Sequence, residues 1–208
     1  LRRRGGLRRR GAPVSMVNLT TEFDAFVASK DLAGKAQALL VQGRRLIFDL
    51  ASDKLLIAIT SPLDLLRELF TVKGAGTLLR RGAVIDRRAG FANIDALRLR
   101  ALLESSFGCA PVDAFFERPV SRIYVEEGYR GAAVMKDTAL GGYLCKFAVD
   151  REAQGEGIGR DLWDRVVADY PVLFWRARPE NPVSSWYNQQ CDGTARFAEW
   201  HVFWKGLA

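Results

Sequence analysis

The chain contains little of what metal centres and membrane anchors require. Its 208 residues include one histidine, His201, and three cysteines, Cys109, Cys145 and Cys191. No two cysteines have the close spacing of a zinc motif, so we expect no bound metal ion and at least one free thiol. No apolar run approaches the roughly 18 residues that cross a bilayer, so we expect no membrane partner.

Positive charge is concentrated at the start of the chain. The net charge is +7, and six arginines fall among the first ten residues, so the remainder is close to neutral. A chain of this kind lacks the basic groove that nucleic acids require, and we expect no nucleic-acid partner. Residues 1–13 could be a flexible linker, an expression remnant or a transit-peptide remnant, and we favour the linker.

One stretch late in the chain has the pattern of a strand, a glycine-rich turn and a helix. Residues 143–149 are apolar and aromatic apart from Lys146, which is typical of a strand. Residues 161–168 place apolar side chains on one stripe of a helix. Between them lies Gln154-Gly-Glu-Gly-Ile-Gly159. Glycines let backbone N–H groups approach an anion, and the positive end of a helix favours phosphate, so we interpret this turn as a pyrophosphate site.

The spacing of the glycines distinguishes between kinds of phosphate loop. Gly155-x-Gly157-x-Gly159 does not have the G-x-G-x-x-G spacing of a dinucleotide fold, and no Gly-Lys-Ser/Thr is present. The run matches Gln/Arg-x-x-Gly-x-Gly/Ala and resembles the acetyl-CoA loop of the GNAT acetyltransferases. A glycine-rich turn without a ligand is the alternative.

The resemblance implies an α/β chain with the GNAT acyl-CoA N-acyltransferase fold. This is a mixed, mostly antiparallel sheet with a splayed central strand pair, flanked by helices. Residues 61–208 are expected to form this domain, and residues 14–60 look like the diverged tail of an amino-acid-kinase-like domain or a linker. Expected helices span residues 63–70, 94–105 with Asn93 as the cap, 112–117, 161–168 and 184–190. A hairpin is expected over 121–135, and strands over 143–149, 172–176 and 199–205.

Four motifs in order narrow the resemblance to the N-acetylglutamate synthases. They are Glu68-Leu-Phe-Thr-Val-Lys-Gly-Ala-Gly-Thr-Leu78, Tyr143-Leu-Cys-Lys-Phe-Ala-Val149, Leu173-Phe-Trp-Arg-Ala-Arg178 with Asn181-Pro182 and Tyr187, and Asp192-Gly193 with Phe203-Trp-Lys-Gly-Leu207. In that family an amino-acid-kinase-like domain precedes the acetyltransferase. Its phosphate loops are not in this chain, so we expect neither phosphorylation of acetylglutamate nor a complete arginine-regulatory site here.

The resemblance also implies partners and a location. These are acetyl-CoA and L-glutamate, an N-terminal kinase domain in the parent protein, and further copies of the protein in a homo-oligomer. The location is the cytoplasm in a bacterium, or the mitochondrial matrix in a eukaryote. For acetyl-CoA, the implied contacts are Phe147, Ala148, Val149, Gln154, Gly155, Gly157, Ile158, Gly159 and Arg160.

Glutamate carries two carboxylates, so its binding site calls for at least two cations near the thioester. Arginine suits a carboxylate because its guanidinium donates two parallel hydrogen bonds to the two carboxylate oxygens. Lys146 lies within an apolar strand and Arg176 ends the next strand, so splayed strands would place both beside the acetyl group. We favour Arg176 as the direct contact and Arg178 as its brace. The alternatives are a surface lysine and arginines solvated at a sheet edge. The resemblance adds Leu144 and Asn181 as acceptor contacts.

Acetyl transfer needs a proton for the departing CoA thiolate. Tyr187 resembles the family tyrosine placed at that sulfur, and we assign it as the general acid, with Asn181 beside it. The alternative for Tyr187 is a packed aromatic side chain next to Trp186. No histidine is available as a base, so water is the default base.

Two positions depart from the family pattern. Cys145 stands where the family has Asp, and strand alternation predicts that it faces away from Lys146, with little effect. Cys109 stands where the family tends to have a basic residue. Two other functions stay open: transfer to another small acid or a peptide N-terminus, and CoA binding without turnover.

Overall fold

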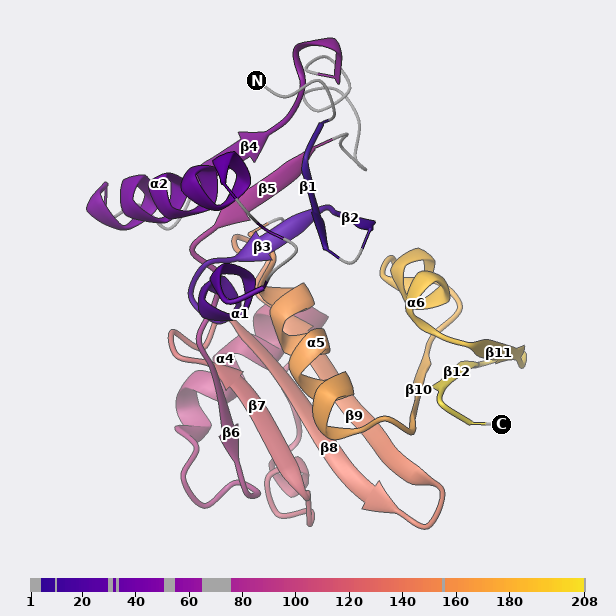
Figure 1. Cartoon of the computed structure of the whole chain (residues 1–208). Helices are drawn as coiled ribbons and strands as arrows, with labels where there is room; N and C mark the ends of the chain where they lie inside the picture. The colour runs from indigo at the N-terminus through magenta and orange to yellow at the C-terminus, as the bar shows by residue number, and fades with distance from the viewer. Residues whose placement is uncertain are drawn as a thin grey trace. The chain divides into compact units, whose positions relative to one another are not determined.

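The computed structural model describes residues 5–9, 11–29, 32, 34–50, 55–64, 76–154 and 156–207 (Figure 1). Two compact units divide the chain, Leu1–Val84 and Ile85–Ala208, and each is described by itself.

The described residues of the N-terminal unit form two small sheets and two α-helices. An antiparallel hairpin joins β1 (Leu7–Arg9) to β2 (Ala12–Val14), and a second sheet has the order β3-β5-β4. The other elements are β3 (Met16–Asn18), α1 (Phe23–Val27), α2 (Lys35–Asp49), β4 (Leu56–Ile59), a 3-10 helix over Pro62–Asp64, and β5 (Thr77–Arg80). Their apolar side chains form one core, which includes Leu7, Leu40 and Leu79.

Two features of this unit differ from the sequence-based expectations. Part of the Arg-rich segment is a paired hairpin, because Leu7 is buried and its backbone N–H donates to Thr77 Oγ1 at 2.7 Å. The division between units falls after Val84 rather than at residue 60, because β5 pairs with β3 and β4. Most of the predicted helix over residues 63–70, and most of the motif at residues 68–78, lie outside the described residues.

The C-terminal unit is built on a seven-stranded sheet with the order β11-β12-β10-β9-β8-β7-β6. The strands are β6 (Ile85–Arg88), β7 (Arg122–Glu126), β8 (Gly131–Thr138), β9 (Gly141–Val149), β10 (Leu173–Ala177), β11 (Gly193–Arg196) and β12 (His201–Lys205). Every neighbouring pair is antiparallel except β9 with β10. The expectation of a mixed, mostly antiparallel sheet is therefore confirmed.

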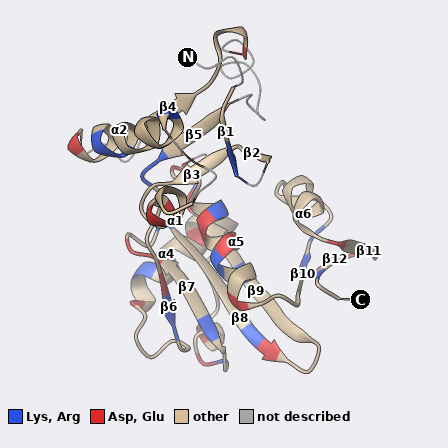
Figure 2. Ribbon diagram, in the orientation of Figure 1, with Lys and Arg blue, Asp and Glu red and all other residues tan. Residues whose placement is uncertain are grey.

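Helices cover both faces of this sheet. Helix α5 (Ile158–Asp169) lies on one side of β7, β8 and β9, and α4 (Ala96–Phe107) lies on the other (Figure 1). Leucines of α4 form a core with the inward side chains of β7, β8 and β9. Helix α6 (Ser184–Gln190) precedes β11 and lies against β12. Figure 2 shows both signs of charge along α5.

The sequence placed one helix start wrongly and missed two strands of this unit. Asp95, not Asn93, caps α4, because its Oδ1 accepts from the N–H groups of Leu97 and Arg98 at 3.1 Å. Strands β6 and β11 are short and polar, so alternation does not reveal them, and each is held by pairing with one neighbour. The predicted helix over residues 112–117 is a short 3-10 helix, Asp113–Phe115.

None of the helices in the described ranges has the length and apolar character that a membrane span requires.

Candidate active site

The central strands of the C-terminal unit part after a short parallel pairing. The last paired residues of β9 and β10 are Leu144 and Trp175. Strand β9 runs on to Val149 and β10 runs on to Ala177. The predicted splayed pair is therefore confirmed, and it leaves one edge of β9 open beyond Leu144. Backbone N–H groups on such an edge are free to bind a ligand.

Aromatic contacts identify the faces of the two parted strands. The ring of Tyr143 on β9 stacks on Phe174 of β10, with centroids 5.1 Å apart. On the other face, Phe147 and Trp175 both contact Trp163 of α5. Since alternate residues of a strand share a face, Arg176 lies on the same face as Phe174, away from α5.

Lys146 lies on the face of β9 that α4 covers. Its ammonium group is 4.8 Å from the centroid of Phe107, at the end of α4, and 5.8 Å from that of Phe115. Cations are attracted to the negative face of an aromatic ring, so these rings orient the side chain.

The prediction that Cys145 faces away from Lys146 is wrong. A β-bulge places Lys146 opposite Val134 and Leu144 opposite Met135, so Cys145 is an extra residue in β9. Cys145 therefore packs against the core beneath α4, on the same face as Lys146. Burial raises the pKa of its thiol, which keeps it neutral next to the lysine.

Arg176 and Arg178 share one aromatic platform. Their guanidinium carbons lie 4.0 and 4.1 Å from the ring centroid of Trp200, just before β12. Arg178 also donates to the backbone oxygen of Glu199 at 3.3 Å and lies 3.6 Å from its carboxylate. Arg176 is exposed. In the described part of the chain, neither the Arg176 nor the Lys146 side chain forms an ion pair or a hydrogen bond, so both cations are available to an anion.

The glycine-rich turn brings the N-terminus of α5 close to β9. Gly157 is the N-cap in a left-handed conformation (φ 86°), which glycine adopts readily, and no described side chain caps this end. A Cβ on Gly159 would lie 3.3 Å from Val149 Cγ2, so the helix start lies against the open strand. Gln154 and Arg160 are exposed. Gly155 lies outside the described residues. Ile158 is buried and contributes its backbone alone.

Two other predicted contacts can act only through the backbone. The side chains of Leu144 and Ala148 are buried in the core, with 4% and 1% exposure. Cys109, where the family tends to have a basic residue, is exposed.

Tyr187 of α6 is buried among aromatic rings. Its ring lies 5.7 Å from Trp175 and 5.5 Å from Phe203, and burial raises its pKa to about 12. Its hydroxyl has no hydrogen-bond partner among the described residues and stays protonated at neutral pH. Asn181 accepts from Val183 N–H at 2.9 Å, which forms the turn before α6.

Sequence reasoning missed the aromatic platforms of this site. Phe107, Phe115 and Trp200 each lie against a predicted cation. They come from a helix, a 3-10 helix and a loop that are distant in sequence from those cations, so no local spacing indicates the contacts. Within the described ranges, no group of three or more histidine, cysteine, aspartate and glutamate side chains is placed to hold a metal ion.

The parted strand pair, the bulged β9 and the glycine-capped start of α5 define the class as a GNAT acyl-CoA N-acyltransferase fold. A solved structure with this fold is N-acetylglutamate synthase from Neisseria gonorrhoeae complexed with coenzyme A and N-acetyl-glutamate. It matches with a TM-score of 0.52 at 19% identity, over 98% of this chain and 53% of that chain. At 19% identity, this match establishes the fold alone.

The family follows from a sequence match over the whole C-terminal unit. Residues 85–208 match the family model described as NAT, the N-acetyltransferase of N-acetylglutamate synthase. The chain belongs to this family.

Curated relatives extend the similarity to nearly the full chain. The chain is 39% identical to an acetylglutamate kinase of Xanthomonas campestris over 95% of its own length and 47% of the relative's. It is 37% identical to the mitochondrial N-acetylglutamate synthase of Mus musculus over 98% of its own length and 40% of the relative's. The chain thus spans about half or less of the length of these relatives.

Proposed function

We propose that the chain transfers the acetyl group of acetyl-CoA to the α-amine of L-glutamate, giving N-acetyl-L-glutamate and CoA. The observation that carries the proposal is the position of Lys146 and Arg176. They extend from the same face of two parted strands, and neither has an anionic partner among the described residues. Two such cations suit an acceptor with two carboxylates and a free amine.

Acetyl-CoA would bind along the open edge of β9. The diphosphate would accept from the backbone N–H groups at the start of α5, near Gly157 and Gly159, with Gln154 and Arg160 beside it. The thioester carbonyl would accept from the strand N–H groups of residues 147–149, which polarises it. The names of the relatives support both ligands, because the Neisseria protein was solved with coenzyme A and N-acetyl-glutamate.

The transfer would proceed by direct attack. The neutral amine nitrogen attacks the thioester carbon, the C–N bond forms, and the C–S bond breaks as the tetrahedral intermediate collapses. The amine proton passes to water, and the CoA thiolate takes a proton from the Tyr187 hydroxyl. Burial supports this role because it keeps that hydroxyl protonated. Holding amine and thioester together supplies much of the rate.

Arg176 would bind an acceptor carboxylate directly, with Arg178 held beside it by Glu199 and Trp200. Asn181 would reach the acceptor through its amide nitrogen, since its oxygen is used in the turn.

We further propose that the parent protein joins this chain to an amino-acid-kinase-like domain and forms a homo-oligomer. The length and names of the relatives support the kinase domain. Names of both bacterial and mitochondrial relatives fit a cytoplasmic location in a bacterium or a matrix location in a eukaryote.

The test is to incubate the purified chain with acetyl-CoA and glutamate and to identify the product by mass spectrometry. We expect N-acetylglutamate acetylated on the α-amine, in amounts equal to the CoA released. A chain that binds CoA but releases none in the presence of glutamate would show a binding module instead.

A further inference from the structure

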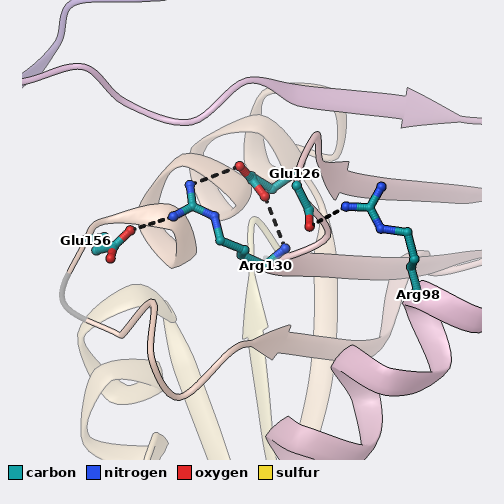
Figure 3. Close-up of polar contacts among 5 residues, drawn as sticks. Arg98, Glu126, Arg130 and Glu156 are labelled. Atoms are coloured by element: carbon teal, nitrogen blue, oxygen red, sulfur yellow. Dashed lines mark hydrogen bonds and ion pairs between the residues drawn. The ribbon is translucent and has the colours of Figure 1, made fainter. Parts of the chain in front are cut away.

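Arg130 links the two ends of the segment that carries the glycine-rich turn. It lies in the turn between β7 and β8, and its backbone oxygen accepts from Asp150 N–H at 2.9 Å, where the segment begins. Its guanidinium donates to the Glu156 carboxylate at 2.8 Å, one residue before the N-cap of α5 (Figure 3). One residue therefore contacts both the start and the end of this turn.

Arg130 is itself held from two sides. The Glu126 carboxylate, of which 7% is exposed, accepts from the Arg130 backbone N–H at 3.1 Å and from its guanidinium at 3.2 Å (Figure 3). A buried carboxylate requires a charged partner, so this pair is fixed. Tyr129, with a positive φ of 59°, completes the turn.

Helix α4 anchors the same turn from its other side. Arg98 donates to the backbone oxygen of Gly128 at 2.7 Å, and its guanidinium lies 4.4 Å from the Tyr129 ring centroid. The Tyr129 hydroxyl accepts from Asp95 N–H at 2.9 Å. The hairpin turn is therefore a rigid support for Arg130.

Glu156 places a negative charge beside the proposed diphosphate site. Glu156 directly precedes the N-cap of α5, so a carboxylate turned toward the helix start would repel a diphosphate bound there, because like charges repel at short range. A free carboxylate there would also compete for the N–H groups of α5. Its ion pair with Arg130 neutralises the charge and holds the carboxylate at the turn between β7 and β8.

We propose that Arg130 is a positioning residue for the donor site: it withdraws the Glu156 carboxylate from the N-terminus of α5 and so admits the diphosphate of acetyl-CoA. This rests on the proposed function. It adds a residue that touches neither substrate but sets the affinity for one of them.

The experiment compares CoA binding by calorimetry for four proteins: the wild type, Arg130→Met, Glu156→Gln and the double variant. Arg130→Met should raise the Kd for CoA about tenfold, because a charged hydrogen bond is lost and the carboxylate is released. Glu156→Gln alone should change it by less than about threefold, because the amide oxygen still accepts from Arg130. The double variant should recover most of the loss, since the repelling charge is gone.

A merely structural role predicts a different pattern. If Arg130 only stiffens the turn, the double variant binds CoA no better than Arg130→Met, and that result would overturn the proposal. Arg88→Met on β6 is the matched control, because it removes an ion-paired arginine of the same unit that contacts neither this turn nor Glu156, and it should leave the Kd unchanged. If Arg130→Met does not fold, Arg130→Gln must show the same loss and rescue, because it also lacks the charge.

A truncated donor separates this inference from the proposed function. S-acetylpantetheine lacks the diphosphate, so Arg130→Met should use it with the same kcat/KM as the wild type. An equal loss with both donors would overturn the proposal. A wild type that binds no CoA would contradict the proposed function and this inference together, whereas normal CoA binding by Arg130→Met contradicts this inference alone.

Discussion

Tyr143 of β9 stacks on Phe174 of β10, with ring centroids 5.1 Å apart and planes inclined by 28°. This contact lies just before the two strands part, and it assigns the face of Arg176, two residues after Phe174. The bulge at Cys145 brings Lys146 to that same face, so the two cations extend from one face on either side of the opening. The proposed acceptor site depends on this geometry.

Arg176→Met tests the direct acceptor contact. We expect kcat/KM for glutamate to fall by a factor equivalent to roughly 2–5 kcal/mol of lost transition-state stabilisation, because a carboxylate loses its charged partner. The KM for acetyl-CoA should not change. Steady-state kinetics with each substrate varied in turn measure both effects. Arg196→Met on β11 is the control, since it removes an exposed arginine elsewhere in the same unit. A near-normal KM for glutamate in Arg176→Met would remove Arg176 from the site.

Trp200→Leu tests the aromatic platform. We expect the KM for glutamate to rise, with binding weakened by about 1–2 kcal/mol, because Arg176 and Arg178 lose the ring that holds them. Trp200→Phe should recover part of the effect because it restores an aromatic face. The control is Trp204→Leu, which removes an indole that covers Gly193 instead. Equal effects of the Trp200 and Trp204 changes would indicate general loosening of β12.

Tyr187→Phe tests the general acid. We expect kcat to fall by roughly 10²-fold with little change in either KM, because the ring still packs against Trp175 and Phe203. Stopped-time assays and a thermal unfolding curve on the same sample separate catalysis from stability. An unchanged kcat would assign the proton donor to another group.

The same tyrosine links stability to alkaline pH. Burial raises its pKa from 10.0 to about 12, so the folded state holds the proton while the unfolded state loses it. The stability that depends on neutral Tyr187 is complete below pH 10 and is lost as pH rises toward about 12. We expect Tyr187→Phe to lose less stability across this window than the wild type, as measured by denaturant unfolding at a series of pH values. If the stability of the wild type and of Tyr187→Phe fell equally with pH across this window, burial would not raise the pKa of Tyr187.

Gly157→Ala tests the conformation of the helix start. The left-handed φ of 86° disfavours a Cβ, so we expect a loss of about 1 kcal/mol in the free energy of unfolding, together with weaker CoA binding. Gly90→Ala is the matched control, because Gly90 is also left-handed (φ 65°) but lies outside the donor site, so it should lose stability and keep CoA binding. Thermal unfolding and calorimetry measure both variants. Equal weakening of CoA binding by the two changes would contradict this account of the turn.

Local patterns revealed some of this site and hid other parts of it. The glycine spacing of residues 154–159 and the apolar run of residues 143–149 indicate a turn and a strand because each depends on neighbouring residues. The bulge at Cys145 arises from pairing with β8, and the contacts of Trp200 arise from the pairing of β10 with β12. Such features depend on strand pairing, and alternation alone gave the wrong face for Cys145.

The central claim is that Lys146 and Arg176 select an acceptor with two carboxylates. The most direct test is the initial rate of CoA release from acetyl-CoA by the wild-type chain with glutamate, aspartate, glutamine and a peptide with a free N-terminus, each at equal concentration. The account predicts that glutamate gives the highest kcat/KM and that glutamine, which lacks the second carboxylate, falls by at least tenfold, about 1.4 kcal/mol. Equal rates with glutamate and glutamine, or a preference for the peptide, would contradict it.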